Sequence, residues 1–472
     1  MANKAKNAVF WSLIERLSTQ VVSFILGIIL ARLLSPNDYG IIGITTIFVL
    51  VSNVFIDAGF ANALIRKSNR TESDLSTAFF FNLILGIFVY ILLFSLSPLI
   101  AAFFEEPILI ILVRIVGLNV FFNSLCVVQT ALLTANLDIK RQTYINICAQ
   151  IPAGLIAVFL AYYGFGVYAL AFQTILSAFL KSLFLWIQTK WYPSVTMSRE
   201  SFNYLWSFGS RLLCANLIGV AFDQVYSVLI GKYVGKEQLG YFSKAQGLNN
   251  NVNSISTGII QRVSLPILSK YQDDILELSE KFRNIMKLLV MLLAPITAFL
   301  FFSSRAIIVF LWTEKWIEAA VLFQFLIICS MFNPIGQLSL SLLQAVGRTG
   351  LMLKLEFPKK ALYCVYIAIG FCYGVKGLVV AMILISITAA IINMWATKKV
   401  ISYSYLLQFV DILKYIVLAF SSAFICSKVV GWDNGIVYVI VLFVSHFVFY
   451  CVILYTINDK LFKNQILSIV IH

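Results

Sequence analysis

Charge is scarce in this chain. Only 12% of its 472 residues are Asp, Glu, Lys or Arg, whereas soluble domains carry roughly 25%. Hydrophobic residues make up 61% of it. Such a composition cannot cover a soluble globule with charge, but it suits helices whose sides face lipid, where charge is expensive. The shortage therefore excludes an ordinary soluble domain and favours a membrane protein.

Motifs for catalysis are missing as well. The chain has no GxxxxGK[ST] loop, no HExxH and no CxxC among its eight cysteines. Its only histidines are His446 and His472, and the position of His446 is more typical of a packed residue than of a ligand. The loops are short, so they leave little room for the ordered surface that glycan chemistry needs. We therefore expect no enzyme activity, no cofactor and no metal.

What the chain does contain is a series of apolar stretches, each about 20 residues long, from Phe10 to Ile457. A helix rises ~1.5 Å per residue and the hydrocarbon core is ~30 Å thick, so each stretch is long enough to cross. The stretches are apolar on all faces, which indicates helices and not barrel strands. We predict an all-α polytopic membrane protein with about 14 transmembrane helices. The predicted spans are 10–34, 40–64, 76–104, 108–133, 142–163, 166–188, 203–231, 240–266, 284–304, 317–345, 354–373, 376–396, 411–430 and 435–457.

The distribution of Lys and Arg sets the predicted orientation. With the N-terminus inside, most of these residues fall in inner loops, as the positive-inside rule requires. Both termini are then cytoplasmic. This loop asymmetry also accounts for the net charge of +14, and no dense basic stripe with interleaved aromatics suggests nucleic acid as a partner.

An internal repeat predicts the domain organisation. WSLIERL at 11–17 aligns with WSFGSRL at 206–212, and a second alignment places Gly40 opposite Gly240. The offset is about six spans, an even number, which indicates a parallel repeat related by an axis along the membrane normal. We therefore predict two lobes of about six helices and two added C-terminal helices. The corresponding segments are 1–190 for spans 1–6, 191–400 for spans 7–12, and 401–472 for spans 13–14 and a cytoplasmic tail.

Ionisable residues inside spans are the candidate functional residues, because each costs several kcal/mol if it faces lipid. The candidate cations of a water-filled, positively charged cavity are Arg16, Arg114, Arg211, Lys244 and Arg262. The candidate acids, for ion coupling or charge balance, are Glu15, Asp57 and Asp223. Arg binds phosphate through two parallel hydrogen bonds, so such a cavity suits an anionic, phosphate-bearing substrate.

Structural explanations compete with this one. Arg32, Lys181 and Arg262 lie where long side chains can extend to the membrane surface. Glu15 and Asp57 fall at matching depth on adjacent antiparallel helices, so an ion pair with Arg16 is also plausible. Pro152, Pro295 and Pro334 interrupt spans, either as hinges or as static kinks whose freed carbonyls are satisfied by neighbours.

Three segments resemble a known family. They are FWSLIERLSTQVVSFILGIILARLLSPNDYGIIGI at 10–44, VFIDAGFANALIRK at 54–67 and GKYVGKEQLGYFSKAQGL at 231–248. These are similar to bacterial polysaccharide flippases, the exporters of lipid-linked O-antigen, capsule or exopolysaccharide repeat units, within the multidrug/oligosaccharidyl-lipid/polysaccharide superfamily. The resemblance extends over nearly the whole chain.

The resemblance implies an inner-membrane protein that moves oligosaccharide linked to undecaprenyl pyrophosphate from the cytoplasmic to the periplasmic leaflet by alternating access. Membrane lipids and polysaccharide assembly proteins are the implied partners, and coupling to H⁺ or Na⁺ is left open. The alternatives are a cation-coupled multidrug exporter of the same superfamily and a membrane glycan polymerase. The resemblance does not select individual site residues.

Overall fold

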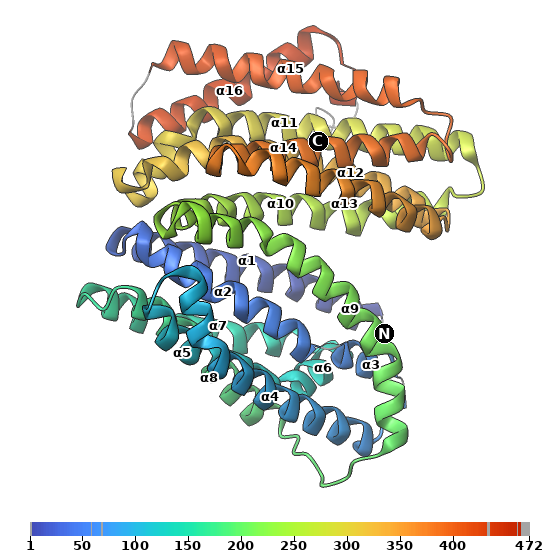
Figure 1. The fold of residues 1–472 in the computed structure, drawn as a ribbon. Helices are drawn as coiled ribbons and strands as arrows, with labels where there is room; N and C mark the ends of the chain where they lie inside the picture. The colour runs from blue at the N-terminus through green and yellow to red at the C-terminus, as the bar shows by residue number, and fades with distance from the viewer. Residues whose placement is uncertain (1, 58, 68, 432–434, 460, 464–472) are drawn as a thin grey trace. The chain divides into compact units, whose positions relative to one another are not determined.

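The computed structural model describes residues 2–57, 59–67, 69–431, 435–459 and 461–463. Over these residues the chain forms helices joined by short turns, and it contains no strand (Figure 1). The predicted all-α class is therefore confirmed. The chain divides into two compact units, unit 1 at Met1–Gly240 and unit 2 at Tyr241–His472. The predicted segments 1–190, 191–400 and 401–472 rest on the repeat and stay a prediction.

Unit 1 contains nine α-helices, one π-helical turn and the first turn of a further helix, counted over the described residues. They are α1 (Ala2–Leu33), α2 (Pro36–Asp57), α3 (Phe60–Arg66), α4 (Glu72–Phe104), α5 (Ile108–Ser124), α6 (Val127–Ala135), α7 (Ile139–Tyr162), α8 (Val167–Thr189), α9 (Arg199–Leu229), η1 (Ile230–Val234) and the start of α10 (Lys236–Lys270). Unit 2 holds the rest of α10, α11 (Ile275–Trp312), the short η2 (Glu314–Trp316), α12 (Ile317–Ala345), α13 (Thr349–Phe371), α14 (Gly374–Thr397), α15 (Tyr405–Val430) and α16 (Ile436–Thr456).

When the helices are judged by length and composition alone, fewer of them qualify as membrane spans than the 14 predicted. In the described part of the chain, 11 helices qualify, or up to 12 if α5 and α6, bent by 44° at their junction, form one broken span. The two other predicted spans, 240–266 and 354–373, do coincide with helices, α10 of 35 residues and α13 of 23 residues. Both are long enough to cross, but charged and amide side chains lower their hydropathy. The predicted count of 14 is not confirmed.

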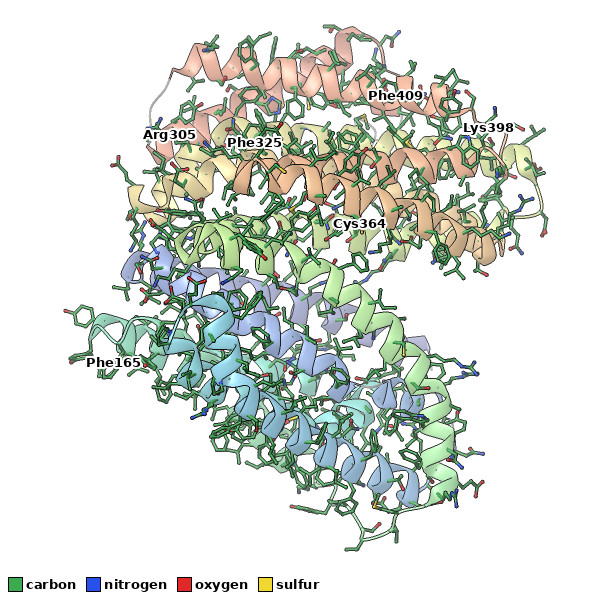
Figure 2. All side chains as sticks on the ribbon, in the orientation of Figure 1. Phe165, Arg305, Phe325, Cys364, Lys398 and Phe409 are labelled. Carbon is green, nitrogen blue, oxygen red and sulfur yellow. The ribbon has the colours of Figure 1, made fainter. Side chains whose placement is uncertain are left out.

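Exposed apolar side chains are common in both units. Phe165 at the α7–α8 turn, Phe325 in α12 and Phe409 in α15 are 54%, 41% and 49% exposed (Figure 2). Water would disfavour so much exposed apolar surface, whereas lipid tails accept it. The backbone polar groups meanwhile pair within the helices, as a bilayer requires. These surfaces fit a multi-pass membrane protein.

In unit 1 the helices that carry the site pack in a continuous series. α1 packs on α7, α7 on α8, α8 on α5, and α5 on α2. α9 packs along α2, α3 and α4. A cluster around Phe60 and Leu64 of α3 and Leu205 of α9 joins these elements. Side chains on the same helix face at i and i+4 spacing can thus meet partners from a neighbouring helix.

The start of α10 crosses α2 in direct backbone contact. A Cβ atom on Gly40 would lie 1.7 Å from the Lys236 carbonyl oxygen, and one on Gly240 would lie 1.9 Å from the Pro36 carbonyl oxygen. Only glycine permits so close an approach. The two glycines that the repeat aligns therefore pack at one crossing. Lys236 also pairs with Glu106, at 2.7 Å between Nζ and Oε1.

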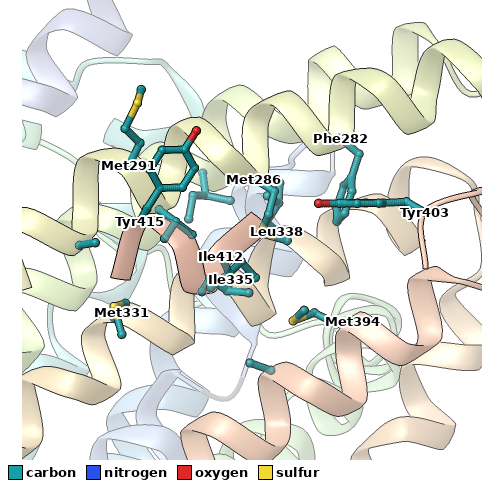
Figure 3. Close-up of a cluster of buried hydrophobic side chains, with 14 of the residues drawn as sticks. Phe282, Met286, Met291, Met331, Ile335, Leu338, Met394, Tyr403, Ile412 and Tyr415 are labelled. Atoms are coloured by element: carbon teal, nitrogen blue, oxygen red, sulfur yellow. The ribbon is translucent and has the colours of Figure 1, made fainter. Parts of the chain in front are cut away.

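Unit 2 is built around a core contributed by α10, α11, α12, α14, α15 and α16, and Figure 3 shows part of it. Its larger members include Phe282, Met286, Ile335, Leu338, Met394, Ile412 and Tyr415, all buried. Because lipid tails are as apolar as these side chains, close packing and dispersion hold the helices together more than water exclusion does.

The proline in α11 shows how unit 2 satisfies its backbone. Pro295 has no N–H, so the carbonyl of Met291 four residues earlier loses its helical donor. The Tyr450 hydroxyl of α16 donates to that carbonyl at 3.2 Å. His446 lies one turn earlier on α16, with its Nε2 3.1 Å from the Pro295 carbonyl and its Nδ1 3.1 Å from Ser422 Oγ. At Pro295 the expected compensation by neighbours occurs, and His446 is a packed residue.

A charged cluster joins the last two helices to α11. Asp411 of α15 accepts hydrogen bonds from Arg283 Nε at 2.7 Å and the Tyr403 hydroxyl at 2.6 Å, and it pairs with Lys287 at 3.1 Å. Asp459, which follows α16, pairs with Lys414 of α15. Burial alone would raise the pKa of Asp459, but hydrogen bonds from Lys414 and the backbone N–H of Phe462 bring it below its usual value.

Candidate functional site

Polar side chains in unit 1 form stripes at four-residue spacing on three helices. α1 carries Glu15, Thr19 and Ser23, α7 carries Asn146 and Gln150, and α8 carries Gln173, Ser177 and Lys181. Residues at i and i+4 lie on the same face of a helix. Because α1 packs on α7 and α7 packs on α8, stripes from neighbouring helices can face a shared space.

The stripes of α1 and α7 are joined by two hydrogen bonds. Asn146 Nδ2 donates to Glu15 Oε1 at 2.7 Å, and Gln150 Nε2 donates to Ser23 Oγ. The ammonium of Lys181 on α8 also acts electrostatically on the Glu15 carboxyl. The acid predicted for ion coupling is thus held by an amide from another helix. The ion pair predicted among Glu15, Arg16 and Asp57 stays a prediction, because the Asp57 side chain lies outside the described residues.

A second polar group connects α2, α5 and α8. Asn123 Nδ2 donates to Asn53 Oδ1 at 3.0 Å and to Asn119 Oδ1 at 2.8 Å. Asn53 Nδ2 lies 3.4 Å from Asn119 Oδ1, and Asn119 Nδ2 lies 3.4 Å from the Thr174 carbonyl of α8. The three asparagines hold one another in place and connect α5 to both neighbouring helices.

A cavity of about 310 Å³ opens beside this group, between α5, α7 and α8. Its lining consists of Asn119, Asn123, Gln150, Gln173, Thr174, Ser177, Ala178 and Lys181. Gln150 lies about 16 Å from the start of α7, and Lys181 about 21 Å from the start of α8, which places both well inside the hydrocarbon region. Lipid would reject such a surface, so this cavity must face water or a polar ligand. We call it the amide pocket.

The predicted cations of unit 1 differ in their surroundings. Arg114 Nε donates to Ser97 Oγ at 2.9 Å, and its guanidinium lies 4.2 Å from the centre of the Phe94 ring. Ser97 in turn donates to the Phe94 carbonyl, which Pro98 has deprived of its helical donor. Arg114 therefore holds the Ser97 hydroxyl beside the proline of α4. The side chains of Arg16 and Arg211 are exposed and make no hydrogen bond or ion pair with the described side chains.

The remaining predicted site residues are spread over several elements. The Asp223 side chain is exposed on α9, and the Asp57 side chain lies outside the described residues. In unit 2, Lys244 Nζ lies 5.1 Å and 5.9 Å from the ring centres of Trp312 and Trp316, while the Arg262 side chain is exposed on α10. The five cations thus lie on four helices, α1, α5, α9 and α10, and their joint role in one cavity stays a prediction.

Most of the amide pocket was not predicted from the sequence, because charged residues were considered before uncharged polar residues at helical spacing. Sequence reasoning gave Lys181 a surface role and did not single out Gln150, Gln173 or Ser177. The signal was the spacing 173, 177, 181 on one helix face, which a search for isolated charges overlooks. Among the described residues, no three His, Cys, Asp or Glu side chains gather as a metal site.

The fold and this site define a class, the multi-pass helical membrane proteins with a polar cavity among their helices. The chain belongs to the family described as "Polysaccharide biosynthesis protein", which matches residues 29–321.

Two curated relatives align over most of the chain. The teichuronic acid biosynthesis protein TuaB of Bacillus subtilis is 24% identical over 411 residues, which cover 86% of this chain and 84% of that protein. The succinoglycan biosynthesis transport protein ExoT of Rhizobium meliloti is 23% identical over 355 residues, 72% of each chain.

Solved structures share the fold. The lipid II flippase MurJ in an inward closed conformation aligns with a TM-score of 0.72 at 15% identity, covering 96% of this chain and 100% of that one. An inward-facing multidrug resistance MATE transporter aligns with a TM-score of 0.63 at 17% identity, covering 85% and 98%. At these identities the likeness concerns the fold alone.

Proposed function

We propose that this protein is a flippase that moves oligosaccharides linked to undecaprenyl pyrophosphate from the cytoplasmic to the periplasmic leaflet by alternating access. The observation that carries the proposal is the amide pocket. It is a polar cavity at membrane depth in a member of a polysaccharide biosynthesis family. A polar oligosaccharide crossing the bilayer needs such a surface, because the hydrocarbon core offers it no hydrogen bonds.

The cargo also has a long apolar chain, and unit 2 has a cavity of matching chemistry. This cavity of about 560 Å³ lies between α10, α11 and α16. Its lining is almost entirely apolar and includes Val252, Ile255, Leu292, Ile296, Phe447 and Leu454. It reaches the middle of α11, at Met291 and Pro295. We assign this cavity to a section of the polyprenyl chain. That chain is apolar, so it has no polar group that would lose a hydrogen-bond partner on entering the cavity.

The diphosphate is assigned to Arg16 and Arg211. Both are arginines on helices that cross the membrane, and their exposed guanidinium groups have no partner among the described side chains. A guanidinium matches the geometry of phosphate oxygens with two donors. We propose that the protein lies in the bacterial inner membrane, and the distribution of Lys and Arg supports cytoplasmic termini. Polysaccharide assembly proteins are its natural partners there.

Conditional depletion of the protein in its native host tests the proposal. Lipid-linked oligosaccharide should accumulate on the cytoplasmic leaflet, where an impermeant periplasmic glycosidase cannot reach it, and surface glycan should fall. Re-expression of the wild-type chain is the control. Normal surface glycan in depleted cells, combined with raised drug sensitivity, would instead favour a multidrug exporter, which the shared fold with a MATE transporter keeps as the second candidate.

The energy source is proposed to be an ion gradient acting through Glu15. A carboxyl inside the membrane that is bonded to Asn146 can change its charge or its partner when a proton or Na⁺ binds. In proteoliposomes, Glu15→Gln should remove the stimulation of transport by an imposed H⁺ or Na⁺ gradient and retain slow exchange without a gradient. Stimulation equal to that of the wild type would remove Glu15 from the coupling mechanism.

A further inference from the structure

The amide pocket contains hydrogen-bonding groups that the fold does not use. Asn119 and Asn123 bond to each other and to neighbouring helices, so they form the framework of the pocket. By contrast, Gln173, Ser177 and Lys181 line the cavity with side chains that bond to no other described residue. In a membrane-depth cavity, polar groups without protein partners are satisfied by water or by a ligand. The α8 stripe is therefore the side of the pocket that is open to a ligand.

The composition of the lining restricts which part of the cargo fits. The pocket has one cation, so it does not provide the several charges that a diphosphate requires. Its amides and hydroxyls would be left unpaired by a prenyl chain. Lys181 repels a cationic drug. The lining offers paired donors and acceptors, because each amide carries an NH₂ group and a carbonyl, and each hydroxyl serves both roles.

We propose that the amide pocket binds a sugar ring of the lipid-linked oligosaccharide and that Gln173 and Ser177 determine which sugar is accepted. This inference rests on the proposed function. Sugar hydroxyls both donate and accept, which matches the lining group for group. The volume of about 310 Å³ is at the small end for ligand sites, as expected for a subsite that holds only part of a long head group.

The pocket can discriminate between sugars because part of its lining, the amides of Asn119 and Asn123, is fixed. Asn119 and Asn123 are held by mutual bonds, so they cannot follow a hydroxyl that points elsewhere. A site built to bond a hydroxyl strongly rejects an analogue that lacks it, because buried polar groups are then left unpaired. Gln173 and Ser177 lie one turn apart on one face of α8, so they can contact neighbouring hydroxyls of the same ring.

Binding measurements on the purified full-length protein in lipid nanodiscs test the inference. The first probe is the lipid-linked oligosaccharide extracted from depleted cells, and the second is undecaprenyl pyrophosphate without sugar. The test variant is Gln173→Leu combined with Ser177→Ala. The matched control is Gln188→Leu, the same change at an exposed position of the same helix, outside the pocket.

The double variant should bind the glycan-bearing probe about tenfold more weakly and the sugar-free probe as the wild type does, since two hydrogen bonds are lost from the sugar only. Gln188→Leu should leave both affinities unchanged. Unchanged sugar-free binding also shows that the double variant is folded. Equal loss on both probes, or no loss on either, would overturn the sugar subsite and leave the flippase proposal standing. A wild-type protein that binds neither probe would overturn the flippase proposal and the subsite with it.

Discussion

Unit 1 and unit 2 both carry polar side chains in the middle of long helices, but they use them differently. In unit 1, Gln173, Ser177 and Lys181 line a cavity and bond to no other described residue. In unit 2, Tyr450 and His446 bond to backbone carbonyls around Pro295. The cavity beside Tyr450 is apolar. These side chains of unit 1 thus remain available to a ligand, whereas those of unit 2 hold its helices together.

An intramembrane polar residue is therefore not by itself a functional residue. Arg114 makes the same point inside unit 1, since its guanidinium already bonds to Ser97 and lies over the Phe94 ring. What separates the two roles is whether the side chain already has a partner. Substitutions should therefore affect transport where the polar group is unused, and stability where it is bonded.

The largest effect is expected at the crossing of α2 and α10, because it concerns both stability and transport. Gly40→Ala would place a methyl group 1.7 Å from the Lys236 carbonyl oxygen, so the backbones must separate. We expect a loss of about 3 kcal/mol or more in stability, measured as thermal unfolding in detergent. Gly27→Ala is the control and should be neutral, because a Cβ added there would meet no atom of another segment within 4 Å. An unchanged unfolding temperature for Gly40→Ala would contradict this contact.

Removal of Arg16 and Arg211, which have no partner among the described side chains, should impair transport without loss of stability. Arg16→Ala and Arg211→Ala should each reduce export, and the double variant should reduce it at least about tenfold, because the diphosphate loses its strongest donors. Lys at either position should restore part of the activity, since it keeps the charge but loses the paired geometry. Arg199→Ala, an exposed arginine at the start of α9, is the control. Full export by the double variant would exclude both from the site.

A hydroxyl that is already bonded in unit 2 should behave in the opposite way. Tyr450→Phe leaves the Met291 carbonyl unpaired and should cost about 1–2 kcal/mol in stability, with transport by the folded fraction unchanged. Thermal unfolding and export measured on the same preparation check this. Tyr455→Phe, 56% exposed on the same helix, should have no effect. If Tyr450→Phe reduced transport without affecting unfolding, the contrast between the units would be wrong.

The smallest effect is expected at Asp459, as a dependence of stability on pH. Its pKa is lowered in the folded protein, so the charged carboxylate contributes stability above its usual pKa of about 4, and that contribution is lost as the pH falls further. Asp459→Asn should therefore unfold more easily than the wild type at pH 7, by about 1 kcal/mol, and the gap should close below pH 3. A gap that stays constant with pH would show that the charge is not involved.

Much of the fold could be predicted because a bilayer leaves few options. Long apolar stretches had to be helices, and the all-α class is confirmed. The count of 14 is not confirmed because α10 and α13 carry too many charged or amide side chains to qualify by composition. At Pro295, the expected satisfaction of a freed carbonyl occurs, although the sequence could not name Tyr450 as the donor.

The candidate site was predictable only in part. Glu15 was identified from its charge, and its partner Asn146 lies 131 positions away in the sequence. The stripe at 173, 177 and 181 is visible in the sequence, but nothing in one helix says whether it faces lipid, a neighbouring helix or a cavity. Isolated charges drew attention to Arg114, whose partners only the packing of α4 against α5 reveals.

Composition and periodicity alone indicate a membrane protein built of helices. The hydrocarbon core tolerates few charged side chains and no backbone N–H or C=O group without a hydrogen bond. Only the tertiary structure shows which polar side chains have no hydrogen-bond partner among the described residues. That outcome depends on which helix faces meet, and a hydrogen bond between distant segments can only be known once the segments are packed together. For this chain, a polar side chain without a hydrogen bond to another described residue is as informative as one that makes such a bond.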